Sequence, residues 1–146
     1  MATPTSFIPR LPWKEQSPEK LPRPPEGRFQ AYSWSPDGER LAGEVEYESG
    51  KWQIAVFSLV SREYKVFPVA GNSAVWLSDN RRLLFDDGGK IFLLDGKTGA
   101  FHEVLSLEPD AVEEGLDLSR DDRTIYFSRM RSEADIWMLT LDEKPR

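Results

Sequence analysis

A short pattern repeats three times in this chain at a fixed interval. The three copies are Trp-Ser-Pro-Asp-Gly at 34–38, Trp-Leu-Ser-Asp-Asn at 76–80 and Leu-Ser-Arg-Asp-Asp at 118–122. Their aspartates, Asp37, Asp79 and Asp121, are each 42 residues apart. A constant period of roughly 40 to 45 residues, built of short strands, is typical of β-propeller blades. The repeat therefore predicts an all-β chain of about three blades.

Every apolar run after residue 28 is short, rich in β-branched and aromatic residues, and bounded by turn-forming residues, which predicts strands. We expect strands at 29–34, 40–47, 53–59, 63–69, 74–77, 82–86, 90–95, 101–106, 113–118, 123–129 and 135–141. The third strand of each repeat is apolar on both faces, as expected for a sheet covered on both sides. The pattern predicts four-stranded antiparallel blades at about 29–70, 71–110 and 111–146, the last with only three strands of its own.

Residues 1–28 differ from the rest because they hold seven of the eleven prolines. Proline breaks helices and is confined to the edges of sheets. We predict that this segment is a linker or contributes an edge strand, with 5–8 and 19–21 as the candidate strands.

Each repeated aspartate is followed by a residue able to take positive φ, which predicts a hairpin turn. The predicted turn pairs are Asp37 with Gly38, Asp79 with Asn80, and Asp121 with Asp122. Catalysis or calcium binding is the alternative role, but one residue type in three symmetry-related turns favours structure. Because Asp tolerates this conformation less well than Gly, the sequence predicts that Asp122→Gly is neutral or slightly stabilising.

The Trp-Ser-Pro-Asp-Gly-x-x-Leu-Ala stretch at 34–42 resembles the hallmark of TolB-type β-propeller repeats, and the later copies resemble degenerate forms of it. The resemblance covers 29–141. The C-terminal part of the chain is similar to propellers of large bacterial signalling proteins, some of which carry a kinase domain. Such propellers usually have six or more blades, whereas this chain offers three, and it has no kinase signature. The resemblance implies a propeller fold, leans towards a periplasmic location, and leaves the activity open.

Composition excludes several function classes. The net charge of −6 disfavours nucleic acid and anionic membranes as partners. There is no cysteine and a single histidine, so disulfides and a zinc site are not expected. No apolar run reaches the roughly 20 residues of a membrane helix, and the proline-rich start has no signal-peptide core. The compartment stays unknown on these grounds.

We predict no enzymatic activity, no catalytic residue, no metal and no cofactor. The single histidine, His102, is expected on a solvated outer strand, and no nucleophile elbow or phosphate-binding loop occurs. Glu44, Glu46 and Glu48 alternate along one strand and so share a face. We expect that face to be solvated, with a channel lining or a cation site as the alternative.

Two inter-strand loops are candidates for binding a protein or peptide ligand. Tyr47 and Trp52 flank the first, and Arg129 and Arg131 belong to the equivalent loop of the third repeat. Exposed aromatic and arginine side chains suit protein interfaces. The alternative is that both aromatic residues simply cap the blade core.

Three blades leave two open faces and an unpaired edge, which invites association. We therefore predict a non-enzymatic scaffold that closes a six-bladed ring by homodimerisation. One chain would lend its N-terminal strand to the last blade of its partner. The expected interface residues are Phe7, Ile8, Leu21, Ile136, Met138 and Thr140. The alternative is a fragment of a larger bacterial signalling protein or peptidase whose propeller senses or gates a ligand.

Overall fold

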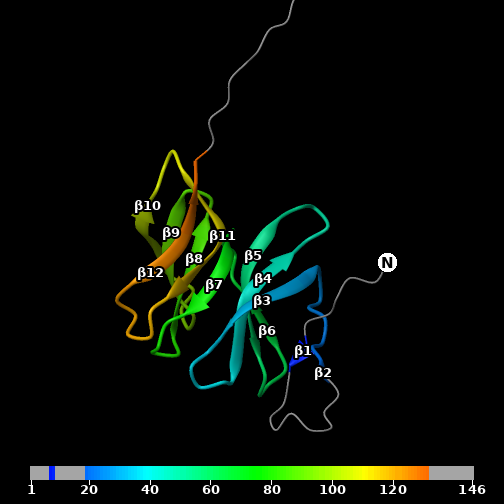
Figure 1. Ribbon diagram of the computed structural model, residues 1–146. Helices are drawn as coiled ribbons and strands as arrows, with labels where there is room; N and C mark the ends of the chain where they lie inside the picture. The colour runs from blue at the N-terminus through cyan, green and yellow to red at the C-terminus, as the bar shows by residue number, and fades with distance from the viewer. Residues whose placement is uncertain (1–6, 9–18, 132–146) are drawn as a thin grey trace, which may run out of the picture.

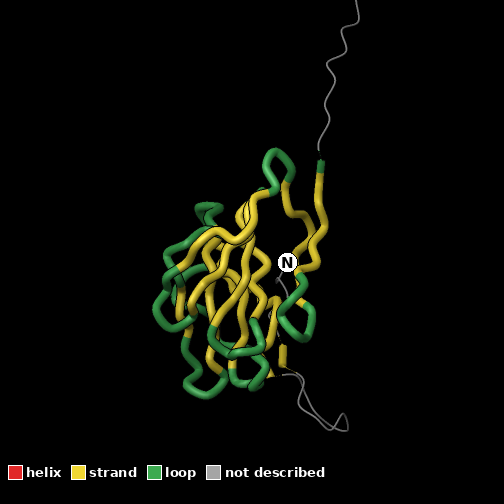
Figure 2. Tube along the Cα trace, turned by 90° about the vertical axis from the view of Figure 1, so that its left-hand side faces the viewer, coloured by secondary structure: helices red, strands yellow, loops and turns green. Residues whose placement is uncertain are grey.

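The computed structural model describes residues 7–8 and 19–131 (Figure 1). All regular structure in this part of the chain is β (Figure 2). The strands are β1 (Phe7–Ile8), β2 (Glu19–Lys20), β3 (Arg28–Trp34), β4 (Arg40–Glu46), β5 (Trp52–Ser58), β6 (Tyr64–Val66), β7 (Asn72–Trp76), β8 (Arg82–Asp87), β9 (Lys90–Asp95), β10 (Phe101–Ser106), β11 (Ala111–Leu118) and β12 (Ile125–Met130). Within the described ranges there is no helix that could span a membrane.

The strands form antiparallel meanders, one after another along the chain. The first sheet has the order β3-β4-β5-β6, the second β7-β8-β9-β10, and β11 pairs with β12 in a third. This arrangement confirms the predicted all-β, blade-like architecture. The expected strand at 135–141 lies outside the described residues.

One predicted strand is shorter than expected. The apolar run at 63–69 forms β6 only over Tyr64–Val66. Pro68 cannot donate a ladder hydrogen bond, so the regular pairing ends before it. Phe67 and Val69 nevertheless remain buried, because they pack into the core beside the sheet.

The hydrophobic core lies between the sheets. Ile54 and Val56 of the first sheet pack with Trp76 and Phe85 of the second. A separate cluster joins Leu84 and Ile91 of the second sheet to Leu116 of the third. The sheets are therefore stacked face to face, as blades are in a propeller, and successive inner strands β3, β7 and β11 follow one another across the molecule (Figure 1).

The N-terminal segment covers part of the outward face of the first sheet. Leu21 is buried against Leu41 and Phe57 of the same chain. The Tyr64 hydroxyl donates a hydrogen bond of 2.7 Å to the Pro22 carbonyl oxygen. This intrachain cap could not be predicted, because proline-rich segments carry no apolar periodicity. The cap leaves part of the first blade uncovered, and the Trp34 side chain remains exposed there.

The repeated turns also fasten neighbouring blades together. Gly38, Asn80 and Asp122 have φ angles of 74°, 56° and 56°. The Asn80 side-chain oxygen accepts a hydrogen bond of 2.8 Å from the Asp37 amide, one blade earlier. Asp122 accepts a bond of 2.9 Å from the Ser78 amide in the same manner. We call these two contacts the inter-blade clasps.

The clasps change the expected effect of Asp122→Gly. A hydrogen bond to a charged group contributes about 1.5 to 3 kcal/mol, whereas relief of left-handed strain returns about 1 to 2 kcal/mol. We therefore expect Asp122→Gly to lower the free energy of unfolding by roughly 1 kcal/mol, measured by urea denaturation. Asp122→Asn keeps an oxygen acceptor but loses the charge, so it should lower the free energy of unfolding less than Asp122→Gly does. A glycine variant more stable than wild type would show that the clasp contributes nothing.

Candidate functional site

A cavity of about 700 Å³ opens between the inner strands of the three sheets. Its polar lining comes from Gln30, Tyr32 and Ser33 on β3, Asn72 and Ser73 on β7, Asp86 on β8, and Glu113 and Asp117 on β11. In a propeller the inner strands border the central channel, so this cavity lies on the side of the blades that faces that channel.

All three inner strands have irregular pairing at this point. The register shifts lie between Ala31 and Ser33 in β3, between Asn72 and Val75 in β7, and between Glu113 and Leu116 in β11. Bulges of this kind re-aim side chains and are common beside functional sites. The repeat thus places three bulges around one cavity.

Ser33 fixes the first two inner strands relative to each other. Its hydroxyl donates to the Ala74 carbonyl oxygen at 3.0 Å and accepts from the Trp76 amide at 3.1 Å. One side chain therefore satisfies a donor and an acceptor of β7. This bridge holds the wall of the cavity in place between the first and second blades.

Glu44 lies behind this wall, where it is only 2% exposed. Tyr32 donates its hydroxyl hydrogen to Glu44 Oε1 at 2.9 Å, and Gln30 donates to the Tyr32 oxygen at 3.0 Å. Burial raises the pKa of Glu44 to about 7, with Asp86 and Glu46 adding repulsion and the Tyr32 bond opposing the rise. The prediction that this strand face is solvated is therefore wrong for Glu44, because the second blade covers its side chain. Glu46 is half-buried and pairs with Arg28, and Glu48 is exposed.

Asp86 is the second buried carboxyl group, at 4% exposure. Burial raises its pKa, while hydrogen bonds from Ser73 and Asn72 act in the opposite direction. One oxygen of Asp86 and one of Glu44 have no hydrogen-bond partner in the described part of the chain. Unpartnered buried oxygens are costly, so each needs a proton, a water molecule or a ligand.

A signal for these two residues was present in the sequence. Glu44 and Asp86 are 42 residues apart, which is the period of the repeat. Both come seven residues after the turn aspartate, so the same strand position carries a carboxyl group in two successive blades. Alignment of acidic residues across the repeats would have found the pair, although burial would not have followed from it.

The raised pKa of Glu44 predicts a pH-dependent stability. The folded state holds this proton more tightly than the unfolded chain, so stability falls as the pH rises from 4.5 to about 7 and then levels off. Glu44→Gln removes the titrating group while keeping the shape. Urea denaturation should show a weaker fall over this range for the variant. Parallel profiles for both proteins would contradict the buried position.

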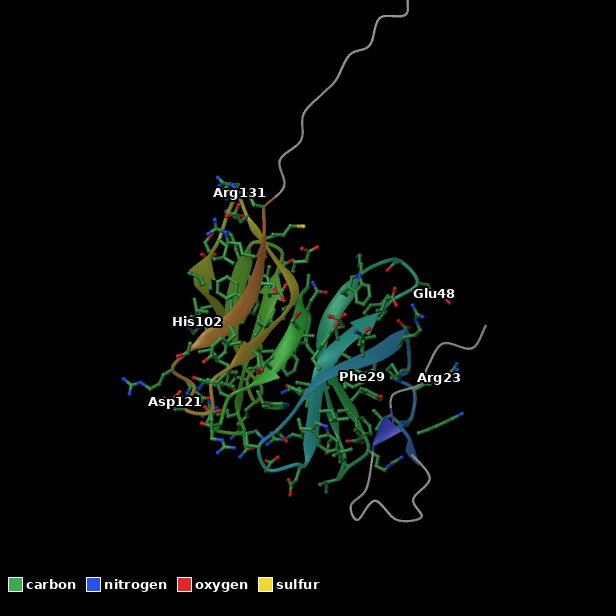
Figure 3. The ribbon with its side chains drawn as sticks, viewed as in Figure 1. Arg23, Phe29, Glu48, His102, Asp121 and Arg131 are labelled. Atoms are coloured by element: carbon green, nitrogen blue, oxygen red, sulfur yellow. The ribbon has the colours of Figure 1, made fainter. Side chains whose placement is uncertain are left out.

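The chemistry of this arrangement is that of buried carboxyl groups, which can hold protons or cations. Within the described ranges, no group of three or more His, Cys, Asp or Glu is placed to hold a metal ion. His102 lies exposed on β10 and is not among the residues that line the cavity (Figure 3). His102 is therefore not placed to exchange a proton with the carboxyl groups at the cavity.

The loop residues predicted to bind a ligand do not form one site. Tyr47 and Trp52 are half-buried and border two separate hollows. Arg129 and Arg131 both face Asp110, with N–O distances of 2.7 and 3.8 Å. Glu48 and Arg131 lie towards the ends of the blades opposite the Asp121 turn (Figure 3). Arg129 lies within β12 and not in a loop, and Arg131 follows that strand. The two predicted regions share an end of the molecule, but their side chains are engaged separately.

The predicted interface residues fall in different places. Phe7 and Ile8 form β1, which pairs with β2 of the same chain. Leu21 is buried in the N-terminal cap. Ile136, Met138 and Thr140 lie outside the described residues. Strand exchange between two chains therefore stays a prediction.

Comparison with known proteins supports the fold. No family model matches the chain, and no curated protein matches it. Among solved structures the chain is similar to TolB from Acinetobacter baumannii, with 21% sequence identity and a TM-score of 0.52. The match covers 76% of this chain and 27% of the TolB chain. This likeness confirms the TolB-like propeller fold expected from the repeats, and the chain spans about a quarter of that protein's length.

Proposed function

We propose that this TolB-like propeller segment is a non-enzymatic scaffold for protein–protein interaction that closes a six-bladed ring by pairing two copies. The blade-like fold and the TolB likeness support a binding role over catalysis. Propellers host many activities, so the proposal depends on the surfaces of this chain rather than on the fold alone.

The observation that carries the proposal is the unequal burial of two tryptophans. Trp34 and Trp76 occupy equivalent positions in successive repeats. Trp76 is 6% exposed because the first blade covers it, whereas Trp34 is 46% exposed. Trp34 is exposed at the position where a blade covers Trp76 in the next repeat. Exposure of a large aromatic side chain at such a position indicates a surface that another blade or protein covers.

The opposite end of the stack has a second apolar surface. Tyr126 and Met130 of β12 are 58% and 42% exposed. Two copies related by a twofold axis would place the third blade of each against the first blade of the other. The same contact then occurs twice, which closes the ring and covers both surfaces.

Exchange of the N-terminal strand would strengthen this closure. We propose that β1 of one copy pairs with residues 135–141 of the other, since added strands gain main-chain hydrogen bonds. Leu21 and Pro22 remain on the first blade of their own chain. Removal of residues 1–18 leaves that cap in place, so it should weaken the dimer without unfolding the blades. A truncated chain that dimerises as tightly as the full chain would contradict the exchange.

Replacement of Trp34 tests the interface. Trp34→Arg should convert the dimer to monomer in light scattering, because a charge replaces the apolar centre of the contact. Its effect on monomer stability should stay within about 1 kcal/mol, as the side chain is half exposed. Val60→Arg is the matched control, since Val60 is an exposed apolar residue in the turn after β5. A dimer that survives Trp34→Arg, whatever the result for Val60→Arg, would place the interface elsewhere.

A further inference from the structure

We propose that two copies join in the register that the blades keep within one chain, with Trp34 of one copy against Tyr126 of the other, and that this joint lacks an inter-blade clasp. The inference rests on the proposed ring closure. It adds which residues meet at the closing joint and which hydrogen bond is missing there.

The same two repeat positions meet at both joints within the chain. Ala42 and Trp76 belong to the core between the first and second blades. Leu84 and Leu118 belong to the cluster between the second and third blades. The second pair follows the first by 42 residues at both positions, so the repeat fixes the register of the joint as well as the fold of each blade.

Tyr126 and Trp34 are the two members of this series without a partner in the chain. Tyr126 follows Leu84 by 42 residues, and Trp34 precedes Trp76 by 42 residues. Their side chains are 58% and 46% exposed. A second copy in the same register brings the two aromatic rings together, and such pairs are favourable when offset or edge to face.

The closing joint differs from the others at the repeated turn. Asn80 and Asp122 provide the clasps to the preceding blade. The equivalent residue of the first blade is Gly38, which has no side chain to offer as an acceptor. Gly38 has a φ of 74°, and a Cβ atom there would meet nothing within 4 Å. Asparagine tolerates this conformation, as Asn80 does at a φ of 56°, so a clasp side chain fits at this position.

The donor side of the clasp is kept in the third blade. The Ser78 amide donates to Asp122, and the residue 42 positions after Ser78 is Arg120, which also has an amide hydrogen. The three repeated turns lie at the same end of the molecule (Figure 1). The closing joint therefore has a donor in one copy and no side-chain acceptor in the other.

Gly38→Asn should supply the missing acceptor at both closing joints of the ring. Sedimentation equilibrium should give a dimer dissociation constant about tenfold lower than that of the wild-type chain, as expected for two additional neutral hydrogen bonds. Strain in the turn does not enter this constant, because it is the same in free and paired copies. An unchanged or higher constant would overturn the missing clasp.

Gly50→Asn is the matched control. Gly50 has a φ of 76° and equally open surroundings, but it lies in the turn between β4 and β5. This variant should change the dissociation constant less than about threefold. Equal tightening by both asparagines would overturn the proposal, because the effect would then not depend on the joint.

An exchange of charges tests the register independently. Trp34→Arg and Tyr126→Glu should each weaken the dimer, and the double variant should bind at least about tenfold more tightly than either single one, because guanidinium and carboxylate then meet. Trp34→Arg combined with Met130→Glu is the control, since Met130 is exposed four residues further along β12. Absence of recovery in the first pair, or equal recovery in both, would overturn the register.

Failure of this inference is distinguishable from failure of the ring itself. A wild-type chain that stays monomeric overturns both. A wild-type dimer that responds neither to Gly38→Asn nor to the charge exchange leaves self-association standing and overturns the proposed joint.

Discussion

Gly43→Ala is expected to lower the free energy of unfolding by about 3 kcal/mol or more. A Cβ atom at this position would lie 1.9 Å from the Gln30 carbonyl oxygen and 2.9 Å from the Ala31 Cα. Both of these neighbours are backbone, at the bulge of β3, and cannot swing aside as a side chain can. The inner strand must therefore move, and the cavity wall that it forms moves with it.

Gly50→Ala is the matched control for this change. Gly50 has a φ of 76°, and a Cβ atom there would have nothing within 4 Å, so only backbone strain of about 1 kcal/mol is expected. Urea denaturation of both variants gives the comparison. Equal losses at the two positions would mean that β3 and β4 do not approach each other this closely.

Phe85→Ala should lower the free energy of unfolding by about 3 to 5 kcal/mol. Phe85 is fully buried and lies in the core between the first and second blades. Its ring stacks on Phe92 at a centroid distance of 5.2 Å. Truncation leaves a cavity that two packed sheets cannot close without separating from their other contacts.

Phe101 provides the control within the same aromatic cluster. Its ring lies 6.1 Å from that of Phe85, but its side chain is 50% exposed. Phe101→Ala should lower the free energy of unfolding by about 1 kcal/mol or less, since little area leaves the core. Similar losses for Phe85→Ala and Phe101→Ala would contradict the stacking of the first blade on the second.

The strands are well predicted from the sequence because their signals are local. Turn pairs such as Asp37-Gly38 and short β-branched runs mark each hairpin, and the observed strands follow them closely. The one clear shortening, at β6, follows from Pro68, whose effect on the ladder is also local. The fixed repeat then extends one hairpin pattern to the whole chain.

Contacts between blades are harder to predict, because they join residues about 42 positions apart. Asn80 and Asp122 are recognisable as turn residues, but their bonds to the previous blade depend on how the sheets stack. Glu44 has the sequence pattern of a surface residue, and only the packing of the second blade buries it. The cavity is likewise formed by three separate sheets, so no single stretch of sequence encodes it.

The N-terminal segment illustrates the same limit. Its prolines predict an extended chain, yet nothing in their spacing indicates that Leu21 packs against Phe57. That contact covers one open face in part and leaves the Trp34 side chain exposed. The exposed tryptophan is therefore known only from the packed structure, and it is the basis for the proposed ring.

The molar mass of the chain in solution tests ring closure most directly. Sedimentation equilibrium over a range of micromolar concentrations should give twice the chain mass of 16.7 kDa, with no larger species, because a twofold ring leaves no open face. A single species at 16.7 kDa throughout this range would contradict ring closure.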